Sequence, residues 1–355
     1  MSDFKACTED DVREALDFIH GDDRETWILI GCAIKNEFGN NGFDLWDSWS
    51  ALQAGYNKKQ IIVDWKAIKA FGKGGSVTIA TLFKLAIDGG YEQRPISEEE
   101  QKSNQIKAAE RAKQRAVDEE KQRAHDEKFR AAAAAAAVKI HRSLSSSGDS
   151  PYLFKKQVKA YGLGFVQQGI ILFYDELLAD VSLIFGQENI SDFFKIKDRP
   201  EHQSFLYIKP GVVAVPMINE TGTLQNLQFI FENGGKKFIK GGVKSGCWTR
   251  LGLYENAHDD VVIAEGYSTA ASVHEATGLT VYMAFDAGNL WNVAQVVRKE
   301  FANANIIFTA DDDRETEAAG KGNPGRDKAN TAAKSVGGLV VCPDFMLGNN
   351  DEAAA

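Results

Sequence analysis

The chain has 355 residues, of which 44% are hydrophobic, and its 41 Lys and Arg against 50 Asp and Glu give a formal net charge of −9. This length accommodates two or three domains, and the hydrophobic content excludes a chain that is disordered throughout. No apolar run reaches the roughly 18 residues that would span a bilayer, so we expect no membrane partner. The acidic start MSDFKACTEDD lacks the pattern of a secretory signal, and we expect a cytoplasmic protein.

Residues 1–96 are predicted to form a compact helical domain. Apolar residues recur three and four positions apart in DDVREALDFI and ETWILIGCAIKNEF. The domain also contains Trp27, Trp46, Trp49 and Trp65. Such rings can stack on nucleic-acid bases, but their spacing favours packing in the core of a helical domain.

A charged, alanine-rich segment, residues 97–150, is predicted to be a helical linker. Ser97 and Glu100 fit the capping box that begins a helix, and residues 131–137 are seven consecutive alanines, which are strong helix formers. The helix could be a spacer between a recognition domain and a working domain, or a partly frayed connection. It lacks sustained apolar heptads, so a coiled-coil dimer is not supported.

Residues 151–257 are predicted to form a region of short strands. GVVAVPMI, LQFIFE and KKFIKGG are separated by the turns NETG and ENGG. Its last part, residues 232–250, carries one acid and five basic residues: Lys236, Lys237, Lys240, Lys244 and Arg250. Lysines among glycines are typical of a surface that binds the phosphates of nucleotides or DNA, although a solvated hairpin rim would have the same composition.

From residue 258 to residue 345, short apolar runs alternate with helical segments. The predicted strands are 261–264, 279–285, 305–310 and 339–342, with helices over 268–277, 289–302 and 325–336. This alternation predicts a parallel sheet covered by helices on both faces. The carboxyl ends of the strands then share one edge, where sites form in sheets of this kind. Residues 346–355 are predicted to be a tail.

Acidic side chains follow three of these strands. Glu265 comes after the first, Asp286 after the second, and the run from Asp311 to Asp313 after the third. Clustered carboxylates repel one another unless a hard divalent cation lies between them, and Asp311 and Asp313 would face the same way in an extended segment. The sequence therefore predicts a magnesium site. The four cysteines lack C-x-x-C spacing, so no structural zinc is predicted.

These motifs resemble those of a known family. EGYSTAAS after one strand and TADDD after another resemble the Toprim domain of primases, topoisomerases and related nucleases. VVAVPMINETGTLQNLQFIFENGGKKFIKGG resembles the region before Toprim in phage and plasmid DNA primases, and GNPGRDKANTAA resembles the helix after the Asp-x-Asp motif. The N-terminal LWDSWSALQAGYNKKQIIVDWKAI is similar to a primase-associated helical domain.

The resemblance implies that Glu265, Asp311 and Asp313 hold Mg²⁺ or Mn²⁺ for phosphoryl transfer, with Asp286 as a further member of the cluster. The substrates would be nucleoside triphosphates and a single-stranded DNA template. The cations Lys321, Arg326 and Lys328 lie around the start of the helix after the Asp-x-Asp motif and could receive phosphate. No Walker motif is present, so any helicase would be a separate partner.

The chain departs from the family pattern at two places. Cellular primases often have another acid four positions after the motif glutamate, where this chain has Thr269, and they begin with a zinc module that is absent here. The expected fold class is multidomain α+β and α/β, with the helical domain, the linker and a mixed region before a Rossmann-type, Toprim-like domain. A primase is the favoured function; the alternatives are a Toprim metal-dependent nuclease and a degenerate DNA-binding replication accessory protein.

Overall fold

A computed structural model describes residues 7–21, 23–53, 55–68, 77–92, 97–253, 259–310 and 323–342. The chain divides into two compact units, Met1–Arg123 and Ala124–Ala355. The division falls inside the segment predicted to be a linker. The five predicted domain boundaries themselves stay predictions.

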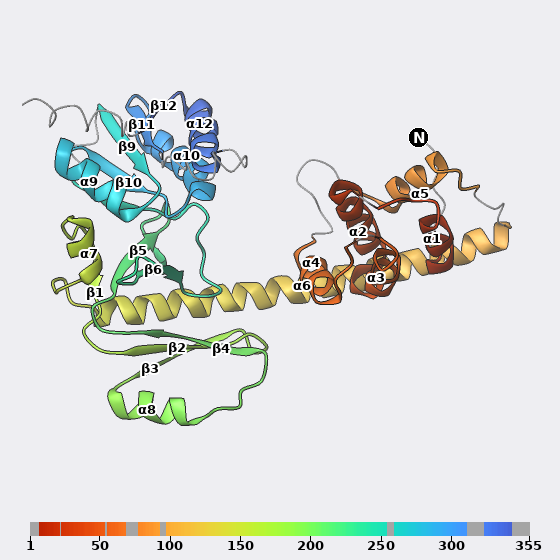
Figure 1. The fold of residues 1–355 in the computed structure, drawn as a ribbon, viewed down its shortest axis with the longest axis horizontal. Helices are drawn as coiled ribbons and strands as arrows, with labels where there is room; N and C mark the ends of the chain where they lie inside the picture. The colour runs from red at the N-terminus through yellow and green to blue at the C-terminus, as the bar shows by residue number, and fades with distance from the viewer. Residues whose placement is uncertain are drawn as a thin grey trace, which may run out of the picture. The chain divides into compact units, whose positions relative to one another are not determined.

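The N-terminal unit contains short helices, as predicted (Figure 1). They are α1 (Glu9–Leu16), α2 (Arg24–Phe38), the 3-10 turn η1 (Gly39–Gly42), α3 (Phe43–Ser50), α4 (Lys58–Ala67) and α5 (Ile79–Asp88). Side chains satisfy free backbone amides where several of them begin: Thr8 and Asp11 form a capping box before α1, and Asp23 accepts from the amide of Thr26 at 2.8 Å.

Tryptophans form the centre of this unit's core. Trp46, Trp49 and Trp65 are no more than 6% exposed, and Trp27 packs against them with its ring 4.3 Å from that of Trp46. Three of these tryptophans donate a hydrogen bond from the indole N–H: Trp27 to Ser50 Oγ, Trp46 to the carbonyl of Trp27 and Trp49 to the carbonyl of Ile19. The prediction that these rings pack in the core is confirmed.

Helix α6 (Glu98–Ser143) confirms the long helix predicted for the alanine-rich segment. Its start has the predicted capping box, in which the amide of Ser97 donates to Glu100 Oε2 and the amide of Glu100 donates to Ser97 Oγ. One side of the alanine run is buried. Ala133 and Ala137 lie with Ile140 in the core of the C-terminal unit. Small side chains let a helix approach a sheet closely, and here they pack against strands on two sides.

Two antiparallel sheets flank this part of α6 (Figure 1). One has the order β1-β5-β6-β7, with β1 (Gly164–Phe165), β5 (Val213–Ile218), β6 (Leu224–Ile230) and β7 (Lys236–Phe238). The other has the order β3-β2-β4, with β2 (Ile170–Asp175), β3 (Asp180–Phe185) and β4 (Gln203–Ile208), and α8 (Gln187–Lys195) covers its other face. The sequence predicted β5, β6 and β7; it did not predict the second sheet, nor α7 (Pro151–Lys156).

The third sheet has the order β12-β11-β9-β10-β8. Its strands are β8 (Thr249–Leu251), β9 (Asp260–Ala264), β10 (Thr280–Met283), β11 (Asn305–Thr309) and β12 (Leu339–Val341). The strands from β9 to β12 are parallel, as predicted, whereas β8 is an antiparallel edge strand that the sequence analysis did not foresee.

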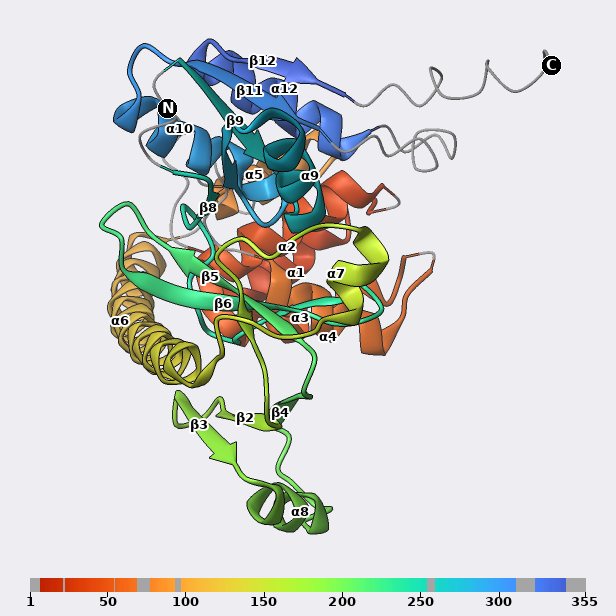
Figure 2. The same cartoon turned by 90° about the vertical axis from the view of Figure 1, so that its left-hand side faces the viewer.

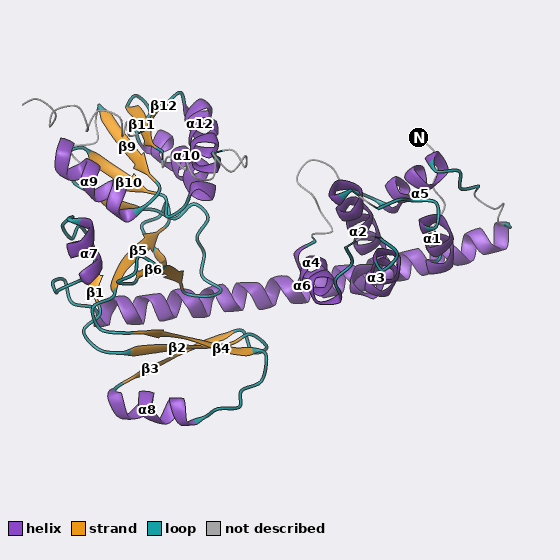
Figure 3. Cartoon of the chain, in the orientation of Figure 1, coloured by secondary structure: helices purple, strands orange, loops and turns teal. Residues whose placement is uncertain are grey.

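Helices cover both faces of this sheet, as predicted (Figures 2 and 3). Val262 and Ala264 of β9 face α9 (Tyr267–Thr277), while Val261 and Ile263 face α10 (Leu290–Glu300) and α12 (Pro324–Val336). Alternate residues of a strand point to opposite faces, so a strand buried on both faces reads as a continuous apolar run. Within the described ranges, no helix has the length and apolar character needed to cross a bilayer.

Candidate functional site

Strand β9 is the central strand of the parallel sheet, and it delivers Glu265 to the carboxyl edge. Its last residue, Ala264, lies opposite Met283 of β10 on one side and Thr309 of β11 on the other. The pairing continues one residue further, since the amide of Ala284 donates to the carbonyl of Ala264 at 2.8 Å. Glu265 therefore leaves the sheet between the two neighbouring strands, at the edge where the sequence predicts a site.

Of the other predicted carboxylates, Asp286 is described and lies three residues after the end of β10. Strand β11 is followed by Ala310, the last described residue before the Asp-x-Asp motif. Asp311, Asp312 and Asp313 lie outside the described residues, as does Lys321. Within the part of the chain that the structure describes, no group of three or more His, Cys, Asp or Glu is placed to hold a metal.

The residues after Glu265 fix the start of helix α9. Gly266 is the N-cap of this helix, and a Cβ at this position would lie 3.2 Å from Lys236 Nζ, so the absence of a side chain leaves room for the lysine beside Glu265. Tyr267 is fully buried; its hydroxyl accepts from the amide of Tyr161 at 2.7 Å and donates to the carbonyl of Lys159 at 3.0 Å. Burial raises the pKa of Tyr267, so the hydroxyl keeps its proton and acts as an anchor.

Asp286 forms an ion pair with Lys244, which belongs to the loop between β7 and β8. This ion pair gives Asp286 a basic partner, so repulsion among the carboxylates does not by itself require a cation at Asp286. The residue before it, Phe285, is buried and has a φ of 73°, which strains a bulky residue by about 1–3 kcal/mol. Packing holds this angle, and the chain turns there to carry Asp286 out of the sheet.

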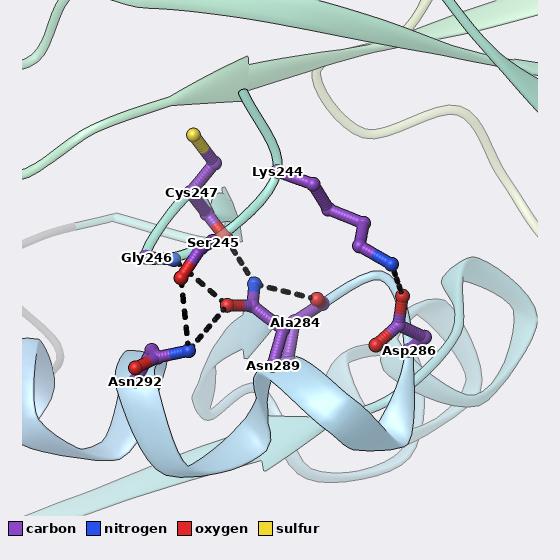
Figure 4. A network of polar contacts seen from close by, with 8 residues as sticks. All are labelled: Lys244, Ser245, Gly246, Cys247, Ala284, Asp286, Asn289 and Asn292. Atoms are coloured by element: carbon purple, nitrogen blue, oxygen red, sulfur yellow. Dashed lines mark hydrogen bonds and ion pairs between the residues drawn. The ribbon is translucent and has the colours of Figure 1, made fainter. Parts of the chain in front are cut away.

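Asn289, which is 2% exposed, connects the Lys244 loop to the end of β10 (Figure 4). Its side-chain amide donates to the carbonyls of Cys247 at 2.8 Å and Ala284 at 2.9 Å, and its Oδ1 accepts from the amide of Gly246 at 2.8 Å. The pattern DAGN after a strand carries no functional signal in a single sequence, so Asn289 was not predicted.

The other residues of the predicted basic segment have separate environments. Lys240 pairs with Glu176 at the end of β2, and Arg250 of β8 lies opposite Tyr282 of β10. Burial raises the pKa of Tyr282, and a hydrogen bond with Arg250 acts in the opposite direction. Arg326 and Lys328 are exposed on α12, near its start.

Lys237 lines a groove of about 960 Å³ on the C-terminal unit. The groove lies between α7, the turn after β4 and the turn before β7, and the sequence did not predict its other two lysines, Lys155 and Lys209. Phe154 at its wall is 88% exposed. Lys236 and Lys237 are neighbours on β7 and therefore point to opposite faces, so one strand presents a cation to the groove and another to the Glu265 turn.

Comparison with known families gives a match within the N-terminal unit. Residues 12–86 match the family described as Primase C terminal 2 (PriCT-2). The chain is also 40% identical over 138 residues to a DNA primase TraC of Escherichia coli, and 39% identical over 138 residues to a second one. Each alignment covers 38% of this chain but only 13% and 10% of those relatives, so the chain spans a small part of their length.

Solved structures of DnaG primases are similar at a lower level. The DnaG primase catalytic domain bound to ssDNA matches 62% of this chain and 76% of that chain, with 16% identity and a TM-score of 0.37. The RNA polymerase domain of Mycobacterium tuberculosis DnaG gives 18% identity and a TM-score of 0.35, over 61% of this chain and 76% of that one. The family match and the TraC alignments confirm the resemblance to DNA primases of the phage and plasmid type that the sequence predicted.

Proposed function

We propose that the chain is a DNA primase that joins nucleotides on single-stranded DNA by metal-dependent nucleotidyl transfer. The observation that carries this proposal is the position of Glu265 at the carboxyl end of the central strand, between β10 and the strand that runs into the Asp-x-Asp motif. The PriCT-2 match and the TraC alignments support the same function. The β8–β12 sheet with α9, α10 and α12 would be the Toprim-like domain.

The donor chemistry at this edge fits a hard divalent cation. Glu265 and the aspartates that follow Ala310 in the sequence come after two neighbouring parallel strands and would supply oxygen ligands, the donor type that Mg²⁺ and Mn²⁺ prefer. Glu265, Asp311 and Asp313 would hold the ion. When bound, the ion would neutralise charge on the triphosphate and on the leaving pyrophosphate.

The chain's own cations would bind the anionic parts of the substrates. Lys236 lies beside the Glu265 turn and Lys244 beside Asp286, so both can receive phosphate oxygens at the edge of the sheet. Lys321, Arg326 and Lys328 are further candidates for phosphate binding.

The groove that Lys237 lines would hold the single-stranded template. Lys155, Lys209 and Lys237 can neutralise backbone phosphates, and the exposed ring of Phe154 can stack on a base. Strand β7 contributes Lys237 to the groove and, on its other face, Lys236 to the Glu265 turn. A separate replicative helicase is a proposed partner.

The test is synthesis on single-stranded DNA with labelled nucleoside triphosphates and Mg²⁺ or Mn²⁺, using the wild type and Glu265→Gln. Wild-type protein should make short products, and the variant should make none. Glu188→Gln, at an exposed position on α8, is the matched control and should keep full activity. Cleavage of the template without synthesis would replace the primase by a nuclease, and neither activity would leave an accessory protein.

A further inference from the structure

The carboxylate of Asp286 forms an ion pair with Lys244. A carboxylate that binds a metal ion is neutralised by the metal and does not need a lysine beside it. Asp286 stands at the N-cap position of the 3-10 turn η3 (Ala287–Asn289), yet its side chain makes no capping hydrogen bond there. It pairs with Lys244 instead. We propose that Asp286 is a positioning residue that orients the Lys244 ammonium toward an incoming nucleoside triphosphate, rather than a ligand of the catalytic metal; this inference rests on the proposed primase function.

The backbone that carries Lys244 is held in place by hydrogen bonds, two of which are buried. Asn289 binds Gly246 and Cys247 on one side and the carbonyl of Ala284 on the other, and Asn292 donates to Ser245 Oγ at 3.2 Å (Figure 4). The two bonds that the Asn289 amide donates, to the carbonyls of Cys247 and Ala284, are buried, so these two are shielded from water. The lysine is therefore anchored to the strand that leads to Asp286.

Neighbouring residues also restrict the positions of the Lys244 ammonium and the Asp286 carboxylate. The ammonium of Lys244 lies 5.7 Å from the centroid of the Phe238 ring, which packs edge-on against Phe285 at 6.5 Å. On the other side, a Cβ at Gly288 would lie 3.1 Å from Asp286 Oδ1, so the glycine leaves room for the carboxylate. A cationic side chain between a carboxylate and an aromatic face has one preferred position.

The chemistry of lysine allows this pair to serve a substrate. An ammonium has three N–H donors, so one can remain with Asp286 while the others bind phosphate oxygens. The side chains of Lys244 and Asp286 are 44% and 32% exposed, so the pair is open to solvent and to a ligand. A metal ion bound to the same carboxylate would instead repel the ammonium next to it.

A double-mutant cycle on the full chain tests the proposal. The variants are Lys244→Ala, Asp286→Asn and the pair together, with the KM for nucleoside triphosphate and the Mg²⁺ half-saturation of primer synthesis as readouts. Losing the charged hydrogen bonds of Lys244 should raise KM about tenfold or more. Asp286→Asn should raise KM by no more than about fivefold, the contribution of an exposed ion pair.

The decisive result is the behaviour of the double variant. If Asp286 acts through Lys244, the double variant should have the KM of Lys244→Ala within about twofold, and no variant should change the Mg²⁺ half-saturation. Asp286→Glu should recover most of the wild-type KM because it keeps the carboxylate. A raised Mg²⁺ half-saturation in Asp286→Asn, effects that add in the double variant, or a lowered KM in Asp286→Asn would each overturn the proposal.

Controls separate this proposal from the proposed function. Lys299→Ala and Glu220→Gln remove another exposed ion pair of the same unit and should change neither readout. Binding of N-methylanthraniloyl-ATP with Mg²⁺, followed by fluorescence, repeats the cycle without synthesis. If the wild type binds this nucleotide but makes no primers, the primase assignment fails while the cycle still decides the role of Asp286. If Lys244→Ala binds it as tightly as the wild type, the role proposed for Lys244 is wrong.

Discussion

The helical N-terminal unit and the parallel sheet of the C-terminal unit use their functional groups differently. In the helical unit, the indole N–H groups of Trp27, Trp46 and Trp49 are bound to acceptors inside the unit. At the carboxyl edge of the sheet, charged side chains such as Lys244 and Asp286 remain partly exposed. The indole groups of the helical unit are used in hydrogen bonds within that unit, whereas the charged side chains at the sheet edge are exposed to solvent.

The family match and the chemistry accordingly lie in different places. PriCT-2 matches residues 12–86, within the helical unit, whereas the motifs that point to phosphoryl transfer begin at Glu265. The PriCT-2 match supports a relationship to primases, but it identifies no residue that takes part in a reaction. Substitutions in the two regions should therefore change different quantities, and the following predictions use this difference.

The largest effect is expected from removing the charges of the Asp-x-Asp motif. Asp311→Asn together with Asp313→Asn should lower primer synthesis about a thousandfold or more, because the metal would lose two ligands. Thermal unfolding should be unchanged. Asp259→Asn, which precedes β9 at the opposite edge of the same sheet, is the control and should retain activity. Full activity in the paired variant would remove the metal site from this edge.

Removing a core ring from the helical unit should change stability instead. Trp46 is fully buried, and Trp46→Ala should lower the free energy of unfolding by about 3–5 kcal/mol through the cavity it leaves. Urea denaturation followed by circular dichroism measures this loss. Leu52→Ala, at a side chain that is 76% exposed, should cost far less. Equal losses in both variants would contradict the core assignment of Trp46.

The groove lysines should affect affinity for the template. Lys155→Ala, Lys209→Ala and Lys237→Ala combined should weaken binding of single-stranded DNA and reduce the slope of log K against log salt by about 0.7 per lost phosphate contact. Fluorescence anisotropy at several salt concentrations measures both. The control replaces three exposed lysines, Lys195, Lys197 and Lys299, by Ala, which changes the net charge by the same amount. This control should leave the slope unchanged. An equal effect of the two triple variants would indicate general electrostatics rather than a groove.

The smallest effect should come from Tyr267→Phe. The variant keeps the ring in the core but leaves the amide of Tyr161 without its acceptor, so the free energy of unfolding should fall by about 1–3 kcal/mol. Chemical denaturation monitored in the C-terminal unit gives this value. A variant as stable as the wild type would mean that the hydroxyl does not anchor the Glu265 turn.

The parts of the fold that could be predicted are those with a local signal. The strands from β9 to β12 are apolar runs separated by helical periodicity, and α6 begins with a capping box, so their positions follow from neighbouring residues. Strands β4 and β8 were missed because their pairing partners, β2 and β10, are distant in the sequence. The β2–β3 hairpin is local, and it was missed although its two strands are joined by a short turn.

The candidate site shows the same limit. Glu265 and its place after a strand were predicted, because the carboxyl ends of parallel strands share an edge. The pairing of Asp286 with Lys244, and the role of Asn289 in holding that loop, join residues about 40 positions apart. No spacing rule connects such residues, so only the folded chain shows them together.

Binding of Mn²⁺ tests the central claim, that carboxylates at the carboxyl edge of the parallel sheet hold a divalent cation, most directly. Electron paramagnetic resonance counts free and bound Mn²⁺ during a titration of the wild type and of Glu265→Gln, without nucleotide or DNA. We expect the wild type to bind Mn²⁺ and the affinity to fall at least about tenfold in the variant, since a charged ligand is lost. Equal Mn²⁺ binding by the two proteins would contradict it.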